Sequence, residues 1–245
     1  MGLKGLLRSG GPSGRRFIEN FKCAKCQDAG VLHPLMENSK PDYSRTIECE
    51  CRVEENKRLR AYNLIRMCEL PAGTENYTLD TFKVRPELKE AFKYAGMLAD
   101  GGSTLKWLTL IGGVDVGKTH LAVAICRRWL ARGVPAKFAY VPLLLDELRR
   151  GYKLEGDDSF DYRFNIFCTV PLLVLDDLGA EHGTDWAREK LDTIIDYRAI
   201  NGLPLVVTTN LSMYELPARI ASRLQRVTFG KVILIDAKEY RIVEK

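Results

Sequence analysis

One octapeptide limits what this chain can fold into more than any other feature. Residues 112–119 read Gly-Gly-Val-Asp-Val-Gly-Lys-Thr, the G-x-x-x-x-G-K-[ST] pattern of a phosphate-binding loop. An apolar run rich in strand formers, 107–111, precedes the loop, and apolar residues recur at helical spacing over 120–130. Because strand, glycine turn and helix are the context that the motif needs, a chance glycine-rich turn is disfavoured.

The residues of this loop have separate physical roles. Gly112 and Gly117 let the backbone bend so that successive N–H groups point at one anion, and the helix N-terminus adds partial positive charge. We expect Lys118 to meet the β- and γ-phosphates of ATP and Thr119 to hold Mg²⁺ through its hydroxyl. The predicted nucleotide-binding residues of the loop are Gly112, Gly113, Val114, Asp115, Val116, Gly117, Lys118, Thr119 and His120.

A second candidate element is the apolar run 171–175, which ends in Asp176 and Asp177. Carboxylates at the C-terminal edge of a buried parallel strand lie where α/β sheets bind ligands. Asp176 would orient Mg²⁺ or its water, and Asp177 would polarise the attacking water. A pair of helix-capping aspartates is the alternative in isolation, but a preceding phosphate loop favours the catalytic interpretation. Since aspartate is shorter than glutamate, we expect slow hydrolysis.

Polar and basic residues follow the next apolar strand, 205–210. Asn210 closes this strand, where its amide could touch the γ-phosphate or position water, although a turn-forming asparagine would read the same. Arg219 and Arg223 lie four residues apart on a predicted helix, 215–224, and therefore share a face. Either could reach a neighbouring subunit's nucleotide as an arginine finger, or both could lie on a solvated helix face.

Strand and helix patterns alternate through most of the chain. Helical patterns cover 86–100, 120–130, 142–150, 186–200 and 215–224, and strand patterns cover 107–111, 137–141, 171–177, 205–210 and 227–235. Repeated alternation of this kind predicts an α/β fold, with a parallel sheet covered by helices.

Four cysteines near the start of the chain predict a metal site. Cys23 and Cys26 form a C-x-x-C pair, and Cys49 and Cys51 form a C-x-C pair after 22 intervening residues. Two such pairs indicate a Cys₄ zinc site, which would hold a segment too small and polar to fold alone. Because C-x-C is tighter than usual, His33 is an alternative ligand, and free thiols or a redox pair are alternatives to zinc. Cys68, Cys126 and Cys168 have apolar neighbours and are predicted to lie in the core.

Composition and local pattern divide the chain into three regions. Residues 1–20 are rich in glycine and serine, and we expect a flexible N-terminus. Residues 21–72 combine the cysteines with a charged linker helix, 52–69, whose expected packing points are Leu59, Ile65 and Met67. Residues 73–245 carry the strand–helix alternation. The net charge of +5 is compatible with nucleic acid without requiring it. Neither a membrane span nor a signal peptide is evident, so we expect a cytoplasmic protein.

Together these motifs resemble the AAA+ ATPases of the DnaC/DnaI helicase-loader group, especially its phage-like members with an N-terminal cysteine cluster. The resemblance runs from about Cys23 to the C-terminus. It rests on the cysteines, GGVDVGKTH (112–120), LLVLDDLGAE (172–181), VVTTN (206–210) and RIASRL (219–224).

This resemblance implies specific roles. Asn210 is similar to sensor 1, Arg223 to the arginine finger and Arg241 to sensor 2. The predicted catalytic residues are Lys118, Asp176, Asp177, Asn210 and Arg223. The family has no full C-terminal helical lid, associates with itself, and loads a DnaB-type hexameric helicase onto single-stranded DNA. Its N-terminal region grips the helicase and its ATPase domain contacts DNA. The implied cofactors are ATP, Mg²⁺ and Zn²⁺.

One stretch offers support for DNA contact from the residues themselves. Arg149, Arg150, Tyr152 and Lys153 interleave basic and aromatic side chains, as 162–164 also does. Cations track the phosphates of a single strand and aromatic rings stack on its bases. An exposed, charged helical hairpin is the alternative for this stretch.

Three other functions fit parts of the sequence. An IstB-like transposition helper has the same ATPase core but serves a transposase on duplex DNA, and that group generally lacks the cysteine cluster. A non-hydrolysing adaptor for a helicase would use zinc and ATP only as structural ligands. A P-loop kinase is disfavoured because no substrate-side motif accompanies the loop.

Overall fold

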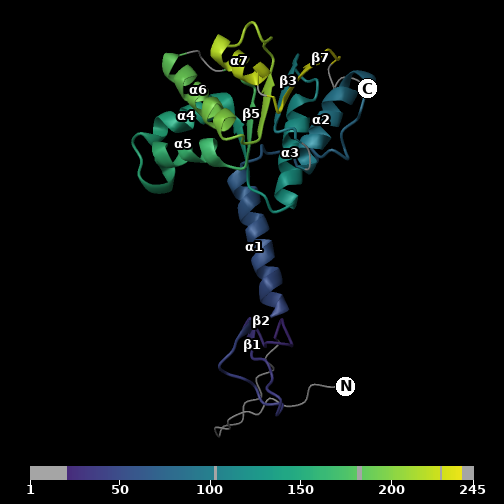
Figure 1. Cartoon of the computed structure of the whole chain (residues 1–245), viewed down its shortest axis with the longest axis vertical. Coiled ribbons are helices and arrows are strands. Elements are labelled where there is room, and N and C mark those ends of the chain that lie inside the picture. Colours follow the sequence, from purple (N-terminus) through teal and green to yellow (C-terminus); the bar gives the residue numbers. More distant parts are fainter. Residues whose placement is uncertain (1–20, 102–103, 181–183, 227, 239–245) are drawn as a thin grey trace. The chain divides into compact units, whose positions relative to one another are not determined.

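The computed structural model describes residues 21–101, 104–180, 184–226 and 228–238 (Figure 1). The predicted flexible N-terminus, 1–20, and the predicted sensor 2 residue Arg241 lie outside the described residues. The chain separates into two compact units, Met1–Arg58 and Leu59–Lys245. Helix α1 (Glu50–Cys68) begins in the first unit and ends in the second.

The first unit has little regular structure in its described part. Strands β1 (Val31–Leu32) and β2 (Ile47–Glu48) form a two-stranded antiparallel sheet, and the first turns of α1 follow directly. Of residues 21–58, three are buried: Cys26, Gly30 and Cys49. Apolar burial on this scale cannot offset the conformational entropy of ordering the segment, so something else must stabilise it.

The second unit is built on a five-stranded sheet with the strand order β4-β5-β6-β3-β7. Every neighbouring pair in it is parallel, as the alternation of strands and helices predicts. The strands in chain order are β3 (Trp107–Gly112), β4 (Ala136–Tyr140), β5 (Leu172–Asp176), β6 (Leu205–Thr209) and β7 (Gly230–Ile235).

Helices cover both faces of this sheet (Figure 1). Helices α2 (Lys89–Asp100) and α3 (Lys118–Ala131) lie on one face. The other face is covered by α4 (Val141–Gly151), α5 (Phe160–Thr169), α6 (Asp185–Ile200) and α7 (Ala218–Arg226). Short 3₁₀ turns, η1 (Pro86–Leu88) and η2 (Gly156–Asp158), precede α2 and α5.

The central strands are apolar on both sides because each face packs against helices. In β5, Leu172 and Val174 join the apolar cluster on one face, whereas Leu173 and Leu175 join the cluster on the other. Every residue of β5 is buried. This explains why its sequence is a continuous apolar run and not an alternating one.

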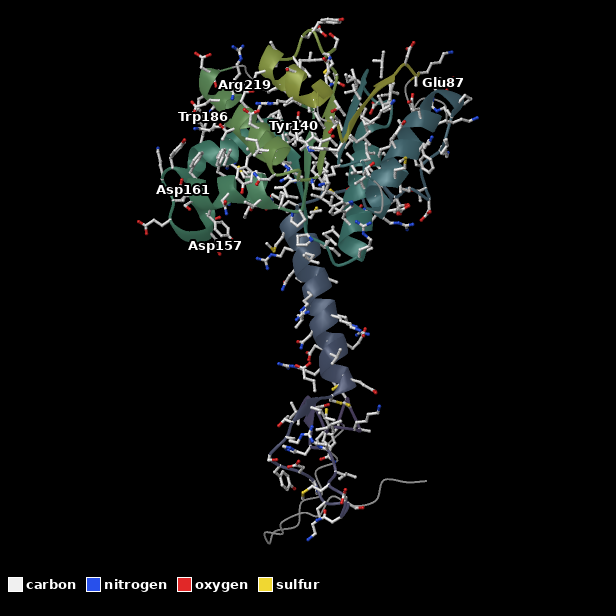
Figure 2. The ribbon with its side chains drawn as sticks, in the orientation of Figure 1. Glu87, Tyr140, Asp157, Asp161, Trp186 and Arg219 are labelled. Carbon is white, nitrogen blue, oxygen red and sulfur yellow. The ribbon has the colours of Figure 1, made fainter. Side chains whose placement is uncertain are left out.

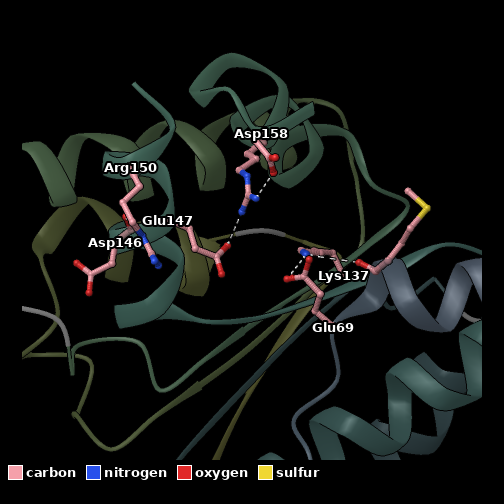
Figure 3. Close-up of polar contacts among 8 residues, drawn as sticks. Glu69, Lys137, Asp146, Glu147, Arg150 and Asp158 are labelled. Carbon is pink, nitrogen blue, oxygen red and sulfur yellow. Dashed lines mark hydrogen bonds and ion pairs between the residues drawn. The ribbon is translucent and has the colours of Figure 1, made fainter. Parts of the chain in front are cut away.

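The predicted packing points of the linker helix are wrong. Leu59, Ile65 and Met67 are more than half exposed, while Cys68 is buried and Leu64 packs against the core. Residues four apart share one helix face, so the face that contains Leu64 and Cys68 turns the other three residues outward. The segment after the helix is fixed by Lys137 of β4, whose Nζ lies 2.6 Å from the carboxylate of Glu69 (Figure 3).

Some predicted boundaries also move. Helix α7 begins at Ala218 and not at 215, and β7 begins at Gly230 and not at 227. Cys126 and Cys168 are buried in the core, as predicted. Within the described part of the chain, no helix follows β7, and none is long and apolar enough to cross a membrane.

A fully buried arginine ties α6 to the starts of two strands. The Arg198 guanidinium donates hydrogen bonds to the carbonyl oxygens of Phe167 (3.0 Å), Cys168 (3.1 Å), Val170 (2.9 Å) and Pro204 (2.5 Å). Among the described residues none of its hydrogen-bond partners is an acid, so backbone carbonyls replace the hydration of its terminal amino groups, while Nε is buried without a partner. Such an arrangement stabilises the fold only when all the carbonyls are in place.

Candidate nucleotide-binding site

The phosphate-loop motif forms the turn between β3 and α3. Gly117 caps α3 with φ 97°, in the left-handed region where glycine is unstrained. Gly112 is required for a different reason: a Cβ at this position would lie 2.6 Å from the carbonyl oxygen of Ile235 in β7. The two glycines of the motif are therefore needed by this fold as well as by the ligand that the motif predicts.

Lys118 points back across the loop. Its Nζ donates to the carbonyl oxygen of Gly112 (2.8 Å), to that of Gly113, and to Oδ1 of Asn210 (2.8 Å). Burial lowers the pKa of Lys118, while the charges of Asp177 and Asp176 oppose this shift. The structure thus brings Lys118 and Asn210, 92 positions apart in sequence, into direct contact.

Thr119 and Asp176 form a cluster of oxygen atoms beside the lysine. Thr119 Oγ1 lies 3.1 Å from both carboxylate oxygens of Asp176, and Thr208 Oγ1 donates to Oδ1 at 2.7 Å. Burial raises the pKa of Asp176, and the hydrogen bonds from the two threonines oppose that shift. A hydroxyl and a carboxylate are hard oxygen ligands of the kind that Mg²⁺ takes, so these residues fit the ion.

Asp177 is held from two sides. Its backbone N–H donates to Thr208 Oγ1 (2.9 Å), and its carboxylate Oδ1 accepts from Nδ2 of Asn210 (2.8 Å). Its φ of 60° lies in the left-handed region, which is uncommon for a residue other than glycine. The amide of Asn210 therefore joins the loop lysine to the second aspartate.

Sheet order explains why these residues meet. Strands β5, β6 and β3 are neighbours, and the chain leaves each of them at the same edge. The two aspartates stand at the end of β5, Asn210 follows β6, and the loop follows β3. In an open parallel sheet this edge is where ligands bind.

An open cavity of about 590 Å³ adjoins the loop. Its lining includes 115–120 of the loop and helix start, together with Thr74, Tyr77, Thr81 and Lys83 from the segment before α2. The His120 ring stacks on Tyr77 at 4.4 Å between centroids, with an angle of 2° between the rings. His120 Nε2 donates to the Thr78 carbonyl (2.9 Å), and burial lowers the pKa of His120.

Three members of the predicted loop set do not line this cavity. Gly112 is buried, and Gly113 and Val114 are exposed, whereas Val116 is buried and does line it. Sequence reasoning missed the 72–83 segment and Thr208. The threonine pair in the strand motif VVTTN was the available signal for Thr208, because a polar residue inside a buried strand needs a partner. No periodic pattern marks 72–83.

The predicted arginine finger lies on a different surface. Arg219 and Arg223 of α7 both contact Asp196 of α6, through Arg219 Nη2 (2.6 Å) and Arg223 Nε (2.5 Å). Figure 2 shows Arg219 beside α6 and α7. Arg223 is not among the described residues that line the cavity, so one chain alone does not place this arginine at the nucleotide site.

Comparison with known proteins identifies the family. The model of the family described as IstB-like ATP binding protein matches residues 46–237, more than half of the chain. The chain belongs to this family.

Helicase loaders are among the relatives of this IstB-like chain. The replicative helicase loader DnaI of Bacillus subtilis is 33% identical over 45% of this chain and 35% of its own length. The loader DnaC of Escherichia coli is 24% identical over 78% of this chain and 77% of its own. A putative ATP-binding protein in an insertion sequence of Mycobacterium tuberculosis is 30% identical over 61% of this chain and 63% of its own length. The chain thus spans about a third of the length of DnaI and less than two thirds of the insertion-sequence protein.

Solved structures agree with these matches. A crystal structure of the DnaC helicase loader has a TM-score of 0.58 and 27% identity, and covers 67% of this chain and 99% of that chain. A crystal structure of DnaI has a TM-score of 0.58 and 26% identity, and covers 71% of this chain and 95% of that chain. The predicted AAA+ fold and the predicted resemblance to DnaC/DnaI-type loaders are confirmed.

The four cysteines of this IstB-like chain converge within the first unit. Their sulfur atoms all lie within 4.8 Å of one another; Cys23 and Cys49 are 3.8 Å apart, and Cys26 and Cys51 are 3.3 Å apart. Four sulfurs at about 2.3 Å from a tetrahedral zinc ion would be separated by about 3.8 Å, so the donor set fits zinc.

Local structure brings the tight second pair of cysteines into the cluster. Cys49 follows β2 directly, and Cys51 lies in the first turn of α1. The contact with Cys26 and burial raise the pKa of Cys51, so a metal ion would have to displace its proton on binding. Hydrogen bonds from the backbone N–H groups of Cys26 and Lys25 lower the pKa of Cys23 to about 7. The alternative ligand His33 lies outside this sulfur cluster and is hydrogen-bonded through Nδ1 to the Arg45 carbonyl oxygen (2.9 Å).

The predicted DNA-binding stretch forms part of an aromatic cluster. The Arg149 guanidinium lies over the Trp186 ring at 4.9 Å, and the ring of Tyr152 stacks on Phe160 at 4.3 Å. Trp186 Nε1 donates to the Tyr152 hydroxyl (3.2 Å). Arg149 and Tyr152 are thus fixed in place, while Arg150 and Lys153 extend from exposed positions.

Acids surround this stretch. Over 146–163 there are six acidic residues (Asp146, Glu147, Glu155, Asp157, Asp158 and Asp161) and four basic residues (Arg149, Arg150, Lys153 and Arg163), so its charge is 4 − 6 = −2. Arg163 is paired with Glu147 (3.2 Å) and Asp158 (2.5 Å), the contacts drawn in Figure 3. Electrostatics alone therefore gives weak support to DNA binding here.

Proposed function

We propose that this chain is an ATP-hydrolysing helicase loader that delivers a DnaB-type hexameric helicase onto single-stranded DNA. The observation that carries the proposal is the cluster formed by Lys118, Thr119, Asp176, Asp177 and Asn210 at one sheet edge. Its support from the comparisons is the similarity to two replicative helicase loaders.

In this proposal the cluster residues divide the work on ATP. Lys118 and the loop N–H groups bind the phosphates, while Thr119 and Asp176 hold Mg²⁺, which would neutralise phosphate charge when bound. Asp177 orients the attacking water, and Asn210 keeps its carboxylate in position. Arg223 of a neighbouring subunit stabilises the transition-state charge, so hydrolysis requires self-association.

Nucleotide binding would rearrange the contacts of Lys118. The carbonyl oxygens and the Asn210 amide oxygen that surround its ammonium group have the same acceptor chemistry as phosphate oxygens. The cavity beside the loop supplies room for the nucleoside, and the Tyr77–His120 stack offers an apolar aromatic wall.

We assign partner binding to two regions. Residues 21–72, with the zinc-bearing cysteines, are proposed to grip the helicase, and 73–245 to form the ATPase domain. Arg149, Arg150, Tyr152 and Lys153 are proposed to contact single-stranded DNA. Changing Arg149 and Arg150 to Ala should weaken single-strand binding and leave ATP affinity unchanged; unchanged DNA affinity would contradict this assignment.

ATP turnover tests the central proposal. Wild-type protein should hydrolyse ATP faster with single-stranded DNA and a DnaB-type helicase, and both Lys118→Ala and Arg223→Ala should lower turnover by about 10³-fold or more. Arg128→Ala is the matched control for Arg223, because this arginine of α3 is also exposed and paired with one acid, Asp100, but lies on the other face of the sheet. Turnover that persists in Arg223→Ala would favour a self-contained site, and ATP binding without any turnover would favour a non-hydrolysing adaptor.

A transposition helper is the second candidate, and two observations favour it. The matching family model bears the IstB name, and the insertion-sequence protein is 30% identical over 63% of its length. Equal amounts of duplex and single-stranded DNA, each with and without a DnaB-type helicase, would separate the two functions. A loader should form a stable complex with the helicase, whereas tighter binding to duplex DNA and no helicase complex would support the helper.

A further inference from the structure

The α6–α7 surface presents Arg223 in a particular way. Its guanidinium is bound to Asp196 through Nε, at 2.5 Å from Oδ1. Among the described residues, no partner is found for its two terminal amino groups. A guanidinium held at Nε keeps these groups free for a bidentate contact with phosphate oxygens.

Arg219 is bound differently, and this distinguishes the two arginines. It uses a terminal amino group, Nη2, to contact the other carboxylate oxygen of Asp196 at 2.6 Å. Its side chain is 65% exposed, against 47% for Arg223. The contact with Asp196 therefore occupies part of the phosphate-binding edge of Arg219, whereas it leaves that edge of Arg223 open.

Asp196 is suited to hold Arg223 firmly. Its side chain is 15% exposed, and each of its oxygens accepts from one arginine. Burial alone would favour the neutral acid, but the hydrogen bonds from Arg219 and Arg223 hold the pKa of Asp196 below its ordinary value. Helix α6 is itself anchored two residues later by the buried Arg198, so the carboxylate stands on a rigid element.

We infer that Asp196 is a positioning residue that aims Arg223 at the nucleotide of a second copy of this chain, and that this α6–α7 surface is the face that meets that copy. The inference rests on the proposed function and extends it. Exposed apolar side chains flank the carboxylate on α6, Tyr197 at 40% and Ile200 at 81% exposure. Tyrosine and arginine are both enriched in protein–protein interfaces.

Mixed assemblies test this inference with the full chain. Lys118→Ala protein lacks a working site but can donate Arg223, and Arg223→Ala protein has a site but no arginine to donate. Each alone should turn over little ATP in the presence of helicase and single-stranded DNA. Mixed in equal amounts, they should recover activity, because about a quarter of head-to-tail interfaces pair an intact site with an intact arginine.

Asp196→Asn is then placed in one partner at a time. In the donor (Lys118→Ala with Asp196→Asn) the recovered turnover should fall roughly tenfold to hundredfold, because a small misplacement of a catalytic group is costly. In the acceptor (Arg223→Ala with Asp196→Asn) the recovered turnover should not change. Asp100→Asn in the donor is the matched control and should have no effect, because Asp100 also pairs with an arginine, Arg128, but on the opposite face of the sheet.

Each other outcome overturns the inference in a recognisable way. An equal loss in both arms would mean a general structural role for Asp196, and no loss in either would mean no role in positioning. If the wild type turns over ATP but the mixture does not recover activity, Arg223 does not act on the nucleotide of a second copy. The proposal that the chain hydrolyses ATP would still stand. No turnover by the wild type would refute the proposed hydrolysis first, and the inference with it.

Discussion

In its described part the first unit buries Cys26, Gly30 and Cys49, whereas the second unit has an extensive apolar cluster on each face of its sheet. The four sulfur atoms of the first unit fit one zinc ion, and we expect that ion to stabilise this unit as the apolar clusters stabilise the second. The comparison teaches that two parts of one chain can depend on unrelated forces. It should therefore be possible to unfold each unit while the other stays folded.

Removal of the metal should have the largest effect. We expect Cys49→Ser, or a strong chelator, to unfold 21–58, because binding of structural zinc contributes about 10–16 kcal/mol to small domains. Hydrogen exchange should show loss of protection there, zinc content should fall to background, and the melting of the second unit should stay the same. Cys168→Ser, a buried cysteine of the second unit, should give the reverse pattern. If the amides of 21–58 stay fully protected from exchange without metal, the first unit does not depend on zinc and the contrast between the two units fails.

Loss of the buried arginine should have the next largest effect, in the opposite unit. Arg198→Met leaves several carbonyl oxygens buried without a donor, and we expect it to destabilise the second unit by about 3–5 kcal/mol. Denaturant unfolding would measure this change. Arg188→Met, on the same helix but exposed, should change stability by about 0.5 kcal/mol at most. Zinc content should be normal in both variants.

Asp176 should show a smaller effect that sharpens the comparison. Burial raises the pKa of this acid, so the folded chain binds more protons than the unfolded chain between about pH 4 and the raised value. The stability of the second unit should therefore fall as pH rises through that window. Without nucleotide, Asp176→Asn should raise stability at neutral pH by about 1 kcal/mol, or about 2–4 °C in melting temperature.

Melting curves with and without Mg²⁺ and ATP would complete that test. The wild type should gain stability from the ligand, and Asp176→Asn should gain less. Asp236→Asn, at an exposed position, should behave as the wild type does. A lower melting temperature for Asp176→Asn without nucleotide would show that the threonine hydrogen bonds outweigh the burial of this carboxylate.

Local pattern was sufficient to predict the parallel sheet, the loop and the polar strand ends. Continuous apolar runs such as 171–175 allow few alternatives to a buried strand, and parallel topology then brings Asp176 and Asn210 to one edge. The convergence of the cysteines was likewise predictable from their spacing. The catalytic roles of Asp176 and Asn210 and the metal binding by the cysteines remain predictions.

Contacts between distant segments were beyond local pattern. The sequence of 72–83 contains no pattern that predicts its place beside the cavity, because that place depends on where α3 lies. The same holds for Asp196, an ordinary acid on a helix until α7 places two arginines against it. The packing face of α1 was misjudged because several of its faces carry apolar residues and only the core decides between them.

The carbonyl cage around Arg198 also has a consequence for the order of folding. Its acceptors come from the end of α5 and from the chain entering β5 and β6, so water can leave the guanidinium only after both strands have paired. We therefore expect helix α6 to dock late, after the folding transition state, with φ-values near zero for Arg198. Mutations at this position would speed unfolding and leave the folding rate nearly unchanged.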